Sequence, residues 1–167
     1  MRQKFYSGVG GIGLILNEVY RLYQDENAKA GAMEILDHYL DTSTEDNEEI
    51  YWSDNSPVFF DGGNILYLLD CCNTYKELSS KLNEIIVKAT NHILNQAIDH
   101  KDGGLEIDHL HIDFKHKEPN FEFGTAGMVV ALLQIYCLEK NKNEIVGSSI
   151  NLTISFLFFS RQYICNK

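Results

Sequence analysis

The chain has 167 residues, of which 24 are Asp or Glu and 14 are Lys or Arg, so its formal net charge is −10. This balance argues against a nucleic-acid partner, because neutralising phosphates needs clustered Lys and Arg. Hydrophobic residues make up 44% of the chain and proline occurs twice, which excludes a disordered or linker-dominated protein.

No stretch reaches the roughly 18 consecutive apolar residues of a membrane span. The nearest candidate, Ile150 to Ile164, is interrupted by polar residues and predicts a buried helix. The N-terminus is positively charged, but glycines follow it where a signal peptide would have its apolar core, so we expect a cytoplasmic protein. The four cysteines include no Cys-x-x-Cys, and buried reduced thiols are expected.

In chain order, the pattern Phe-x-x-Gly occurs three times, beginning at Phe5, Phe59 and Phe121, and an apolar run follows each copy. Glycine at a helix start lets the backbone turn sharply and lets another backbone or a ligand come close. The runs are apolar on most faces, which is typical of helices buried from more than one side. We therefore predict buried helices over residues 9–24, 63–75 and 125–139.

Each buried helix is followed by an amphipathic helix, expected over 25–40, 78–98 and 143–164. The prediction is an all-α fold with three helical hairpins, at about 5–40, 57–98 and 119–165, in one partial domain over 1–167. A two-layer ring of such hairpins, an α/α toroid, would gather the glycine-rich starts of its inner helices at one rim. A tetratricopeptide solenoid has too short a period. We interpret the acidic run between the first two hairpins as a solvated loop.

The stretch from Phe121 to Tyr136 resembles the repeat of the lanthionine synthetase C-like (LanC-like) cyclase family, whose inner helices open with Gly-x-Ala-Gly and an apolar run. Gly8 to Leu16 resembles the same motif, and the second copy has Asn64-Ile65 where Ala-Gly is usual. The family's toroid has seven hairpins, of which this sequence supplies about three. The resemblance implies a role in lanthipeptide biosynthesis, in which a cysteine thiol adds to a dehydrated serine or threonine to form a thioether.

The resemblance also implies zinc, which family members hold through one Cys and a Cys-His pair in later repeats. No Cys-His dipeptide occurs here, and Cys71-Cys72 lies mid-helix, so the family's zinc ligands are not found and no cofactor is identified. Zinc is expected only if missing repeats are supplied, and the isolated chain is expected to be inactive or incomplete. The implied partners are a lanthipeptide precursor, the remaining repeats, or a fused dehydratase or kinase domain.

Candidate site residues lie at the expected rim. Asp61 stands where many members have a histidine and is a candidate general base, with capping of the following helix as the simpler alternative. Trp52 is a candidate stacking anchor for a peptide, with covering of the rim as the alternative. The candidate substrate-binding glycines are Gly8, Gly11, Gly62, Gly63, Gly124 and Gly127.

His109, His111 and Asp113 alternate along one segment, and in an extended chain they would share a face. Two imidazoles and a carboxylate on one face form a candidate metal site. The alternative is a surface excursion with solvated histidines.

Three functions fit these observations: a cyclase-like domain, a non-catalytic peptide-binding or scaffold module, and another α/α-toroid enzyme. The third, such as a carbohydrate-active enzyme, would use paired carboxylates like Glu122 and Asp61. Three hairpins would leave apolar flanks uncovered, on Ile12 and Leu16 at one end and on 156–159 at the other. Self-association or incorporation into a larger domain is therefore expected.

Overall fold

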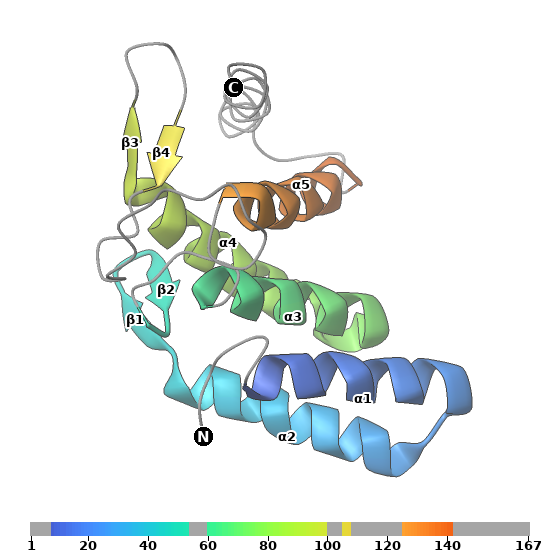
Figure 1. Ribbon diagram of the computed structural model, residues 1–167. Coiled ribbons are helices and arrows are strands. Elements are labelled where there is room, and N and C mark those ends of the chain that lie inside the picture. The colour runs from blue at the N-terminus through green and yellow to red at the C-terminus, as the bar shows by residue number, and fades with distance from the viewer. Residues whose placement is uncertain (1–7, 54–59, 100–104, 108–124, 142–167) are drawn as a thin grey trace.

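The computed structural model describes residues 8–53, 60–99, 105–107 and 125–141 (Figure 1). Within these ranges the chain is all-α apart from two small β-hairpins. The helices are α1 (Val9–Tyr23), α2 (Glu26–Thr42), α3 (Asp61–Thr74), η1 (Lys76–Leu78), α4 (Ser79–Asn95) and α5 (Thr125–Asn141). The strands are β1 (Thr44–Asp46), β2 (Glu49–Tyr51), β3 (Ala97–Asp99) and β4 (Leu105–Ile107). No helix of the described ranges is long and apolar enough to cross a membrane.

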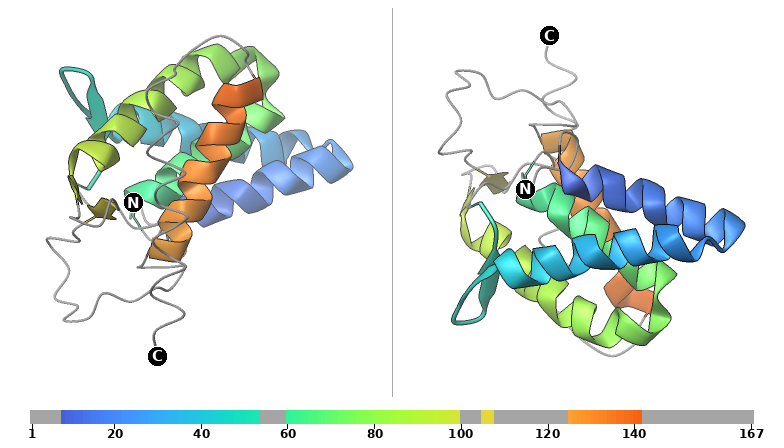
Figure 2. Two further views of the ribbon diagram at one scale, coloured as in Figure 1. Left: turned by 90° about the horizontal axis from the view of Figure 1, so that it is seen from above. Right: turned by 90° about the horizontal axis from the view of Figure 1, so that it is seen from below.

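The helices form two complete hairpins, α1 with α2 and α3 with α4, and α5 follows as the start of a third. Helix α3 packs against both α1 and α5, and Figures 1 and 2 show these three helices stacked in sequence order. In Figure 1 all three begin on the side where the β1–β2 hairpin lies. Helices are thus confirmed over the three apolar runs and over the first two amphipathic stretches. The outer helix expected over 143–164 lies outside the described residues.

A two-residue connection closes the first helical hairpin. Gln24 ends α1 in the left-handed conformation, with φ 54°, and its N–H donates to the Tyr20 carbonyl at 2.8 Å. Asp25 then caps α2, because its carboxylate accepts from the N–H groups of Asn27 at 2.8 Å and Ala28 at 3.1 Å. The local sequence therefore fixes α1 and α2 as antiparallel neighbours.

Helix α3 is the central element of the described structure. It is buried on all sides from Asp61 to Leu69, and Cys71 and Cys72 extend this buried stretch. The apolar sequence of α3 predicted this, since a helix that is hydrophobic all round is covered from several directions. Helix α2, by contrast, buries one stripe, made of Ala28, Ala32, Leu36 and Tyr39.

Close contact between α1 and α3 depends on the absence of a side chain at Gly13. A Cβ atom there would lie 2.4 Å from Cε2 of Tyr67. The Tyr67 ring passes α1 to reach α2, where its hydroxyl donates to the Ala32 carbonyl at 2.7 Å. Gly13 is therefore a packing glycine rather than a turn glycine.

The acidic run between the first two helical hairpins is exposed, as predicted, but it is a β-hairpin and not a loop. It forms the antiparallel β1–β2 hairpin, with Glu45 paired to Ile50. The hairpin lies against α4 because Glu45 binds Lys88 at 2.6 Å and Glu49 accepts from Asn95 at 2.6 Å. Two acidic side chains of the run thus have partners on an outer helix. The end of α4 is also corrected, because residues 97 and 98 belong to β3.

Helix α1 carries an uncovered apolar stripe. Ile12, Ile15, Leu22 and Tyr23 are 56, 65, 64 and 75% exposed, and their spacing places them on one face. The prediction that Ile12 is uncovered is confirmed. The same prediction for Leu16 is wrong, because this side chain packs toward α2. Its Cδ1 atom lies 3.1 Å from the position that a Cβ atom on Gly31 would occupy. The flank predicted at 156–159 lies outside the described residues.

We expect Gly13→Ala to destabilise the protein by roughly 2 to 3 kcal/mol, because the buried Tyr67 ring has no room to retreat. Gly31→Ala is the matched control, since its Cβ would meet only the flexible end of Leu16 and alanine favours the helix by about 1 kcal/mol. Urea unfolding of both variants measures the difference. Equal free energies of unfolding for the two variants would contradict the close approach of α1 and α3.

We expect the α1 stripe to cause self-association that rises with concentration. The double variant Ile15→Lys, Leu22→Lys should remain at the 19.1 kDa monomer mass in sedimentation velocity. Asn73→Lys, an exposed position on α3, controls for added positive charge. A concentration-independent mass for the unmodified chain would refute this expectation.

Candidate functional site

The candidate site is built around Asp61, the first residue of α3. Its Oδ2 accepts from the backbone N–H groups of Trp52 at 3.1 Å and Ser53 at 3.2 Å. Its Oδ1 accepts from the Ser53 hydroxyl at 2.7 Å and from Nδ2 of Asn64 at 3.3 Å. The carboxylate therefore holds the segment after β2 against the start of α3.

These contacts differ from the alternative prediction that Asp61 caps the following helix. The N-cap position of α3 is Phe60, and no described N–H of the helix donates to the Asp61 carboxylate. The side chain is 2% exposed, and burial raises the pKa of Asp61 although the hydrogen bonds from Ser53 and Trp52 lower it. The group is a buried anchor with both oxygens engaged.

Trp52 is fixed against the protein at the same place. Its Nε1 donates to the Tyr39 carbonyl at 2.8 Å, and the two rings meet edge to face at 5.9 Å. Burial, with a further contribution from the Asp61 charge, raises the pKa of Tyr39. These contacts hold Trp52 against Tyr39 of α2, and both of its expected roles, covering the rim and anchoring a peptide, stay predictions.

Asn64 is a site residue that the sequence reasoning did not single out. It is fully buried one turn after Asp61, and its Oδ1 has no hydrogen-bond partner among the described residues. A buried polar atom without a partner is unusual and is a feature of functional sites. The sequence did hold one indication of its importance, because asparagine stands here in place of the alanine of the family motif.

The candidate glycines fall in the first turns of the inner helices, apart from Gly8, which directly precedes α1. Gly62, Gly63 and Gly127 are buried, and Gly11 is half-buried. Their contact with a substrate stays a prediction. Gly124 lies outside the described residues, as do His109, His111, Asp113 and Glu122.

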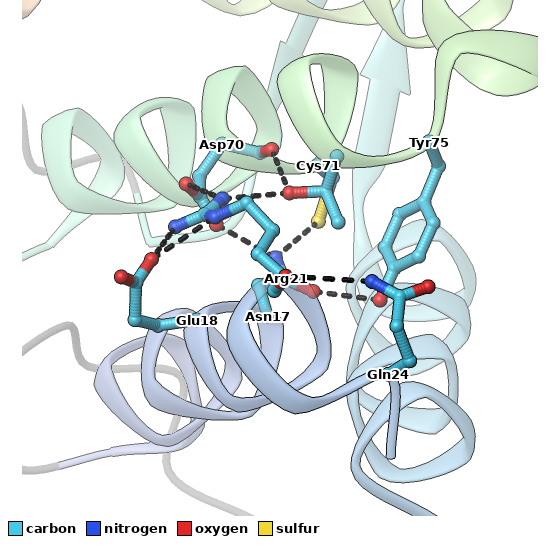
Figure 3. Close-up of polar contacts among 8 residues, drawn as sticks. Asn17, Glu18, Arg21, Gln24, Asp70, Cys71 and Tyr75 are labelled. Carbon is cyan, nitrogen blue, oxygen red and sulfur yellow. Dashed lines mark hydrogen bonds and ion pairs between the residues drawn. The ribbon is translucent and has the colours of Figure 1, made fainter. Parts of the chain in front are cut away.

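A polar cluster joins α1 and α3 farther along these helices (Figure 3). Asn17 is fully buried, donates to Asp70 at 2.7 Å and accepts from the Tyr75 hydroxyl at 2.8 Å. Arg21 donates to the other oxygen of Asp70 at 2.7 Å. Nδ2 of Asn17 also lies 3.5 Å from Sγ of Cys71. Every polar group of Asn17 is thus engaged within the protein.

The described residues do not fit a zinc centre. Burial raises the pKa of the Cys71 thiol to about 11, which opposes the thiolate that a metal requires. The Cys72 thiol faces Oδ1 of Asn83 at 3.6 Å. Within the described ranges, no three His, Cys, Asp or Glu side chains are grouped so that they could hold a metal ion.

The sequence was compared with models of protein families, with curated proteins and with solved structures. A family model described as "Lanthionine synthetase C-like protein" matches residues 1–162. No curated protein and no solved structure matches the chain.

We expect Asp61→Ala to cost roughly 2 to 3 kcal/mol of stability, because it removes the acceptor of the half-buried Trp52 and Ser53 N–H groups and of the buried Asn64 amide. Asp61→Asn should cost less than half as much, since an amide keeps one acceptor and the Ser53 hydroxyl can reverse its bond. Urea unfolding and the emission of Trp52, the single tryptophan, report both effects. Asp37→Ala, at an exposed position of α2, is the control. Equal losses for the alanine and asparagine variants would contradict the anchoring role.

Proposed function

Because the chain belongs to the lanthionine synthetase C-like family, we propose that it acts in lanthipeptide biosynthesis as part of a cyclase domain. The observation that carries this proposal is the family match over nearly the whole chain, joined to stacked inner helices that begin on one side. The proposed partner is a cysteine-containing precursor peptide, and the proposed location is the cytoplasm. The peptide lies across the glycine-rich rim.

The reaction of this proposal is a conjugate addition. The peptide's cysteine loses its proton, its sulfur forms a bond to Cβ of a dehydrated serine or threonine, and a proton is delivered to Cα. Atoms and electrons balance without an oxidant or a reductant. A site for this reaction must hold two points of one peptide close together, which lowers the entropic barrier to ring closure.

Asp61 serves this function by shaping the rim. Its carboxylate is bound by Trp52, Ser53 and Asn64 and is almost fully buried, so it is suited to positioning rather than to collecting a substrate proton. Asn64 adds a buried carbonyl oxygen that has no hydrogen-bond partner in the described part of the chain. The proposal therefore assigns Asp61 a positioning role.

Further repeats complete the site in this proposal. The uncovered stripe on α1, with Ile12 and Ile15, is the face on which another inner helix of a toroid would pack. Such repeats, or a fused dehydratase or kinase domain, would supply the zinc ligands that the described residues lack.

The second candidate is a peptide-binding module without catalysis. The observation that favours it is the engagement of both Asp61 oxygens by the protein itself. A carboxylate in this state is out of reach of a substrate proton, whereas the rim it organises remains available to a peptide.

The test uses a labelled synthetic peptide with one cysteine and one dehydroalanine. We expect it to bind the 167-residue chain in an anisotropy titration, while its free thiol, with zinc added, declines only at the uncatalysed rate. Asp61→Asn should bind the peptide as the unmodified chain does. A peptide with serine and alanine at these two positions is the control.

Each outcome of this test is decisive. Absence of saturable binding by folded protein would overturn the proposal and its peptide-binding alternative together. Accelerated loss of thiol would overturn the requirement for further repeats. If Asp61→Asn removed that acceleration while leaving stability unchanged, the positioning role would be replaced by proton transfer.

A further inference from the structure

A groove lies on the outer layer, between the turn of the β1–β2 hairpin and the surface of α4. It is open and has a volume of about 480 Å³. Its lining residues are Glu48 from the hairpin and Asn83, Glu84, Val87, Lys88 and Asn91 from α4. We call it the α4 groove. It shares no residue with the rim around Asp61.

One wall of the α4 groove offers amide donors. Asn83 is only 8% exposed, and its Oδ1 faces the Cys72 thiol at 3.6 Å. Its Nδ2 donates to no described residue, and the side chain lines the groove, so these N–H groups face the open space. A peptide carbonyl that enters the groove would replace water as their acceptor.

The spacing along α4 suits an extended chain. Asn83, Val87 and Asn91 follow each other at four-residue intervals, so they form one row on the helix. Asn83 and Asn91 are about 12 Å apart along the axis at 1.5 Å per residue. An extended peptide covers this distance in about four residues at 3.3 Å each. Two asparagines can therefore bind one main chain at two points, with Val87 between them.

The charged residues of the α4 groove favour a ligand with basic side chains. Lys88 is neutralised by Glu45 at 2.6 Å, and Glu84 lies 3.7 Å from the same ammonium. Glu48 has no described ion-pair partner and is exposed. The two lining carboxylates thus exceed the free positive charge of the groove, within a chain of net charge −10.

We propose that the α4 groove binds an extended, basic peptide segment. The carboxamides of Asn83 and Asn91 bond its main chain, Val87 contacts an apolar side chain, and Glu48 and Glu84 attract its lysines or arginines. This surface goes beyond the proposed function, because it contacts a peptide away from the rim and needs no reactive residue in that peptide.

The test is an anisotropy titration with a labelled linear decapeptide that contains three lysines and one valine and no cysteine. We expect saturable binding, which Glu84→Lys weakens roughly tenfold through charge reversal at an exposed side chain. Asn91→Ala should weaken binding about three- to tenfold by removing main-chain hydrogen bonds. Glu34→Lys, an equal charge change at an exposed site on α2, should change affinity less than about twofold.

Several results would overturn the proposal. The same peptide with glutamate in place of lysine should not bind, and equal binding would remove the charge argument. If Glu34→Lys weakened peptide binding as much as Glu84→Lys does, the peptide would be attracted by the overall charge of the protein and not bound in the groove. Unchanged affinity in Asn91→Ala would exclude the main-chain contact, and circular dichroism of each variant separates these results from unfolding. Because the decapeptide cannot form a thioether, failure here leaves the proposed ring-forming role intact.

Discussion

The rest of the described structure depends on the burial of α3, which contacts α1, α4 and α5. A helix covered on so many sides needs neighbours that approach closely and polar groups that are satisfied inside the protein. Gly13 meets the first requirement by admitting the Tyr67 ring. Asn17 meets the second by pairing with both Asp70 and Tyr75. The register of the two inner helices is thus set by a steric fit and a polar cluster together.

Most of the helical architecture could be predicted from the sequence, because it follows from periodicity and from local signals. The apolar run after Gly8 and the runs after Phe59 and Phe121 indicated helices buried all round, and α1, α3 and α5 lie at these places. Burial on all sides holds for α3, whereas α1 leaves a stripe exposed. The hairpin in the acidic run was missed because its contacts are tertiary: Glu45 and Glu49 find partners on α4, more than 40 positions away. Which of the neighbouring Ile15 and Leu16 faces α2 depends on the rotation of α1, which two adjacent apolar residues do not define.

The position of the candidate site could be predicted from the sequence, but the hydrogen bonds that define the role of Asp61 could not. Asp61 was singled out because it precedes two glycines, yet its donors, Trp52 and Ser53, come from a hairpin that local propensity did not reveal. The same hairpin contacts α4 through Glu49 and His92 at 2.7 Å. It therefore connects the outer layer to the first turn of α3 by short polar contacts. A change in the packing of the hairpin on α4 reaches the rim through only a few residues.

The burial of Cys71 protects its thiol from alkylation. With a thiol pKa of about 11, only about one molecule in ten thousand carries the thiolate at neutral pH. Dehydrated residues in a peptide are electrophiles, and they alkylate whichever thiolate they meet. Under the proposed function the protein would be exposed to alkylation by the peptide it holds, and the buried position of Cys71 and Cys72 shields both sulfurs from that reaction. Cys137 on α5 is exposed and lacks this protection, so it is the described cysteine at which self-alkylation would begin.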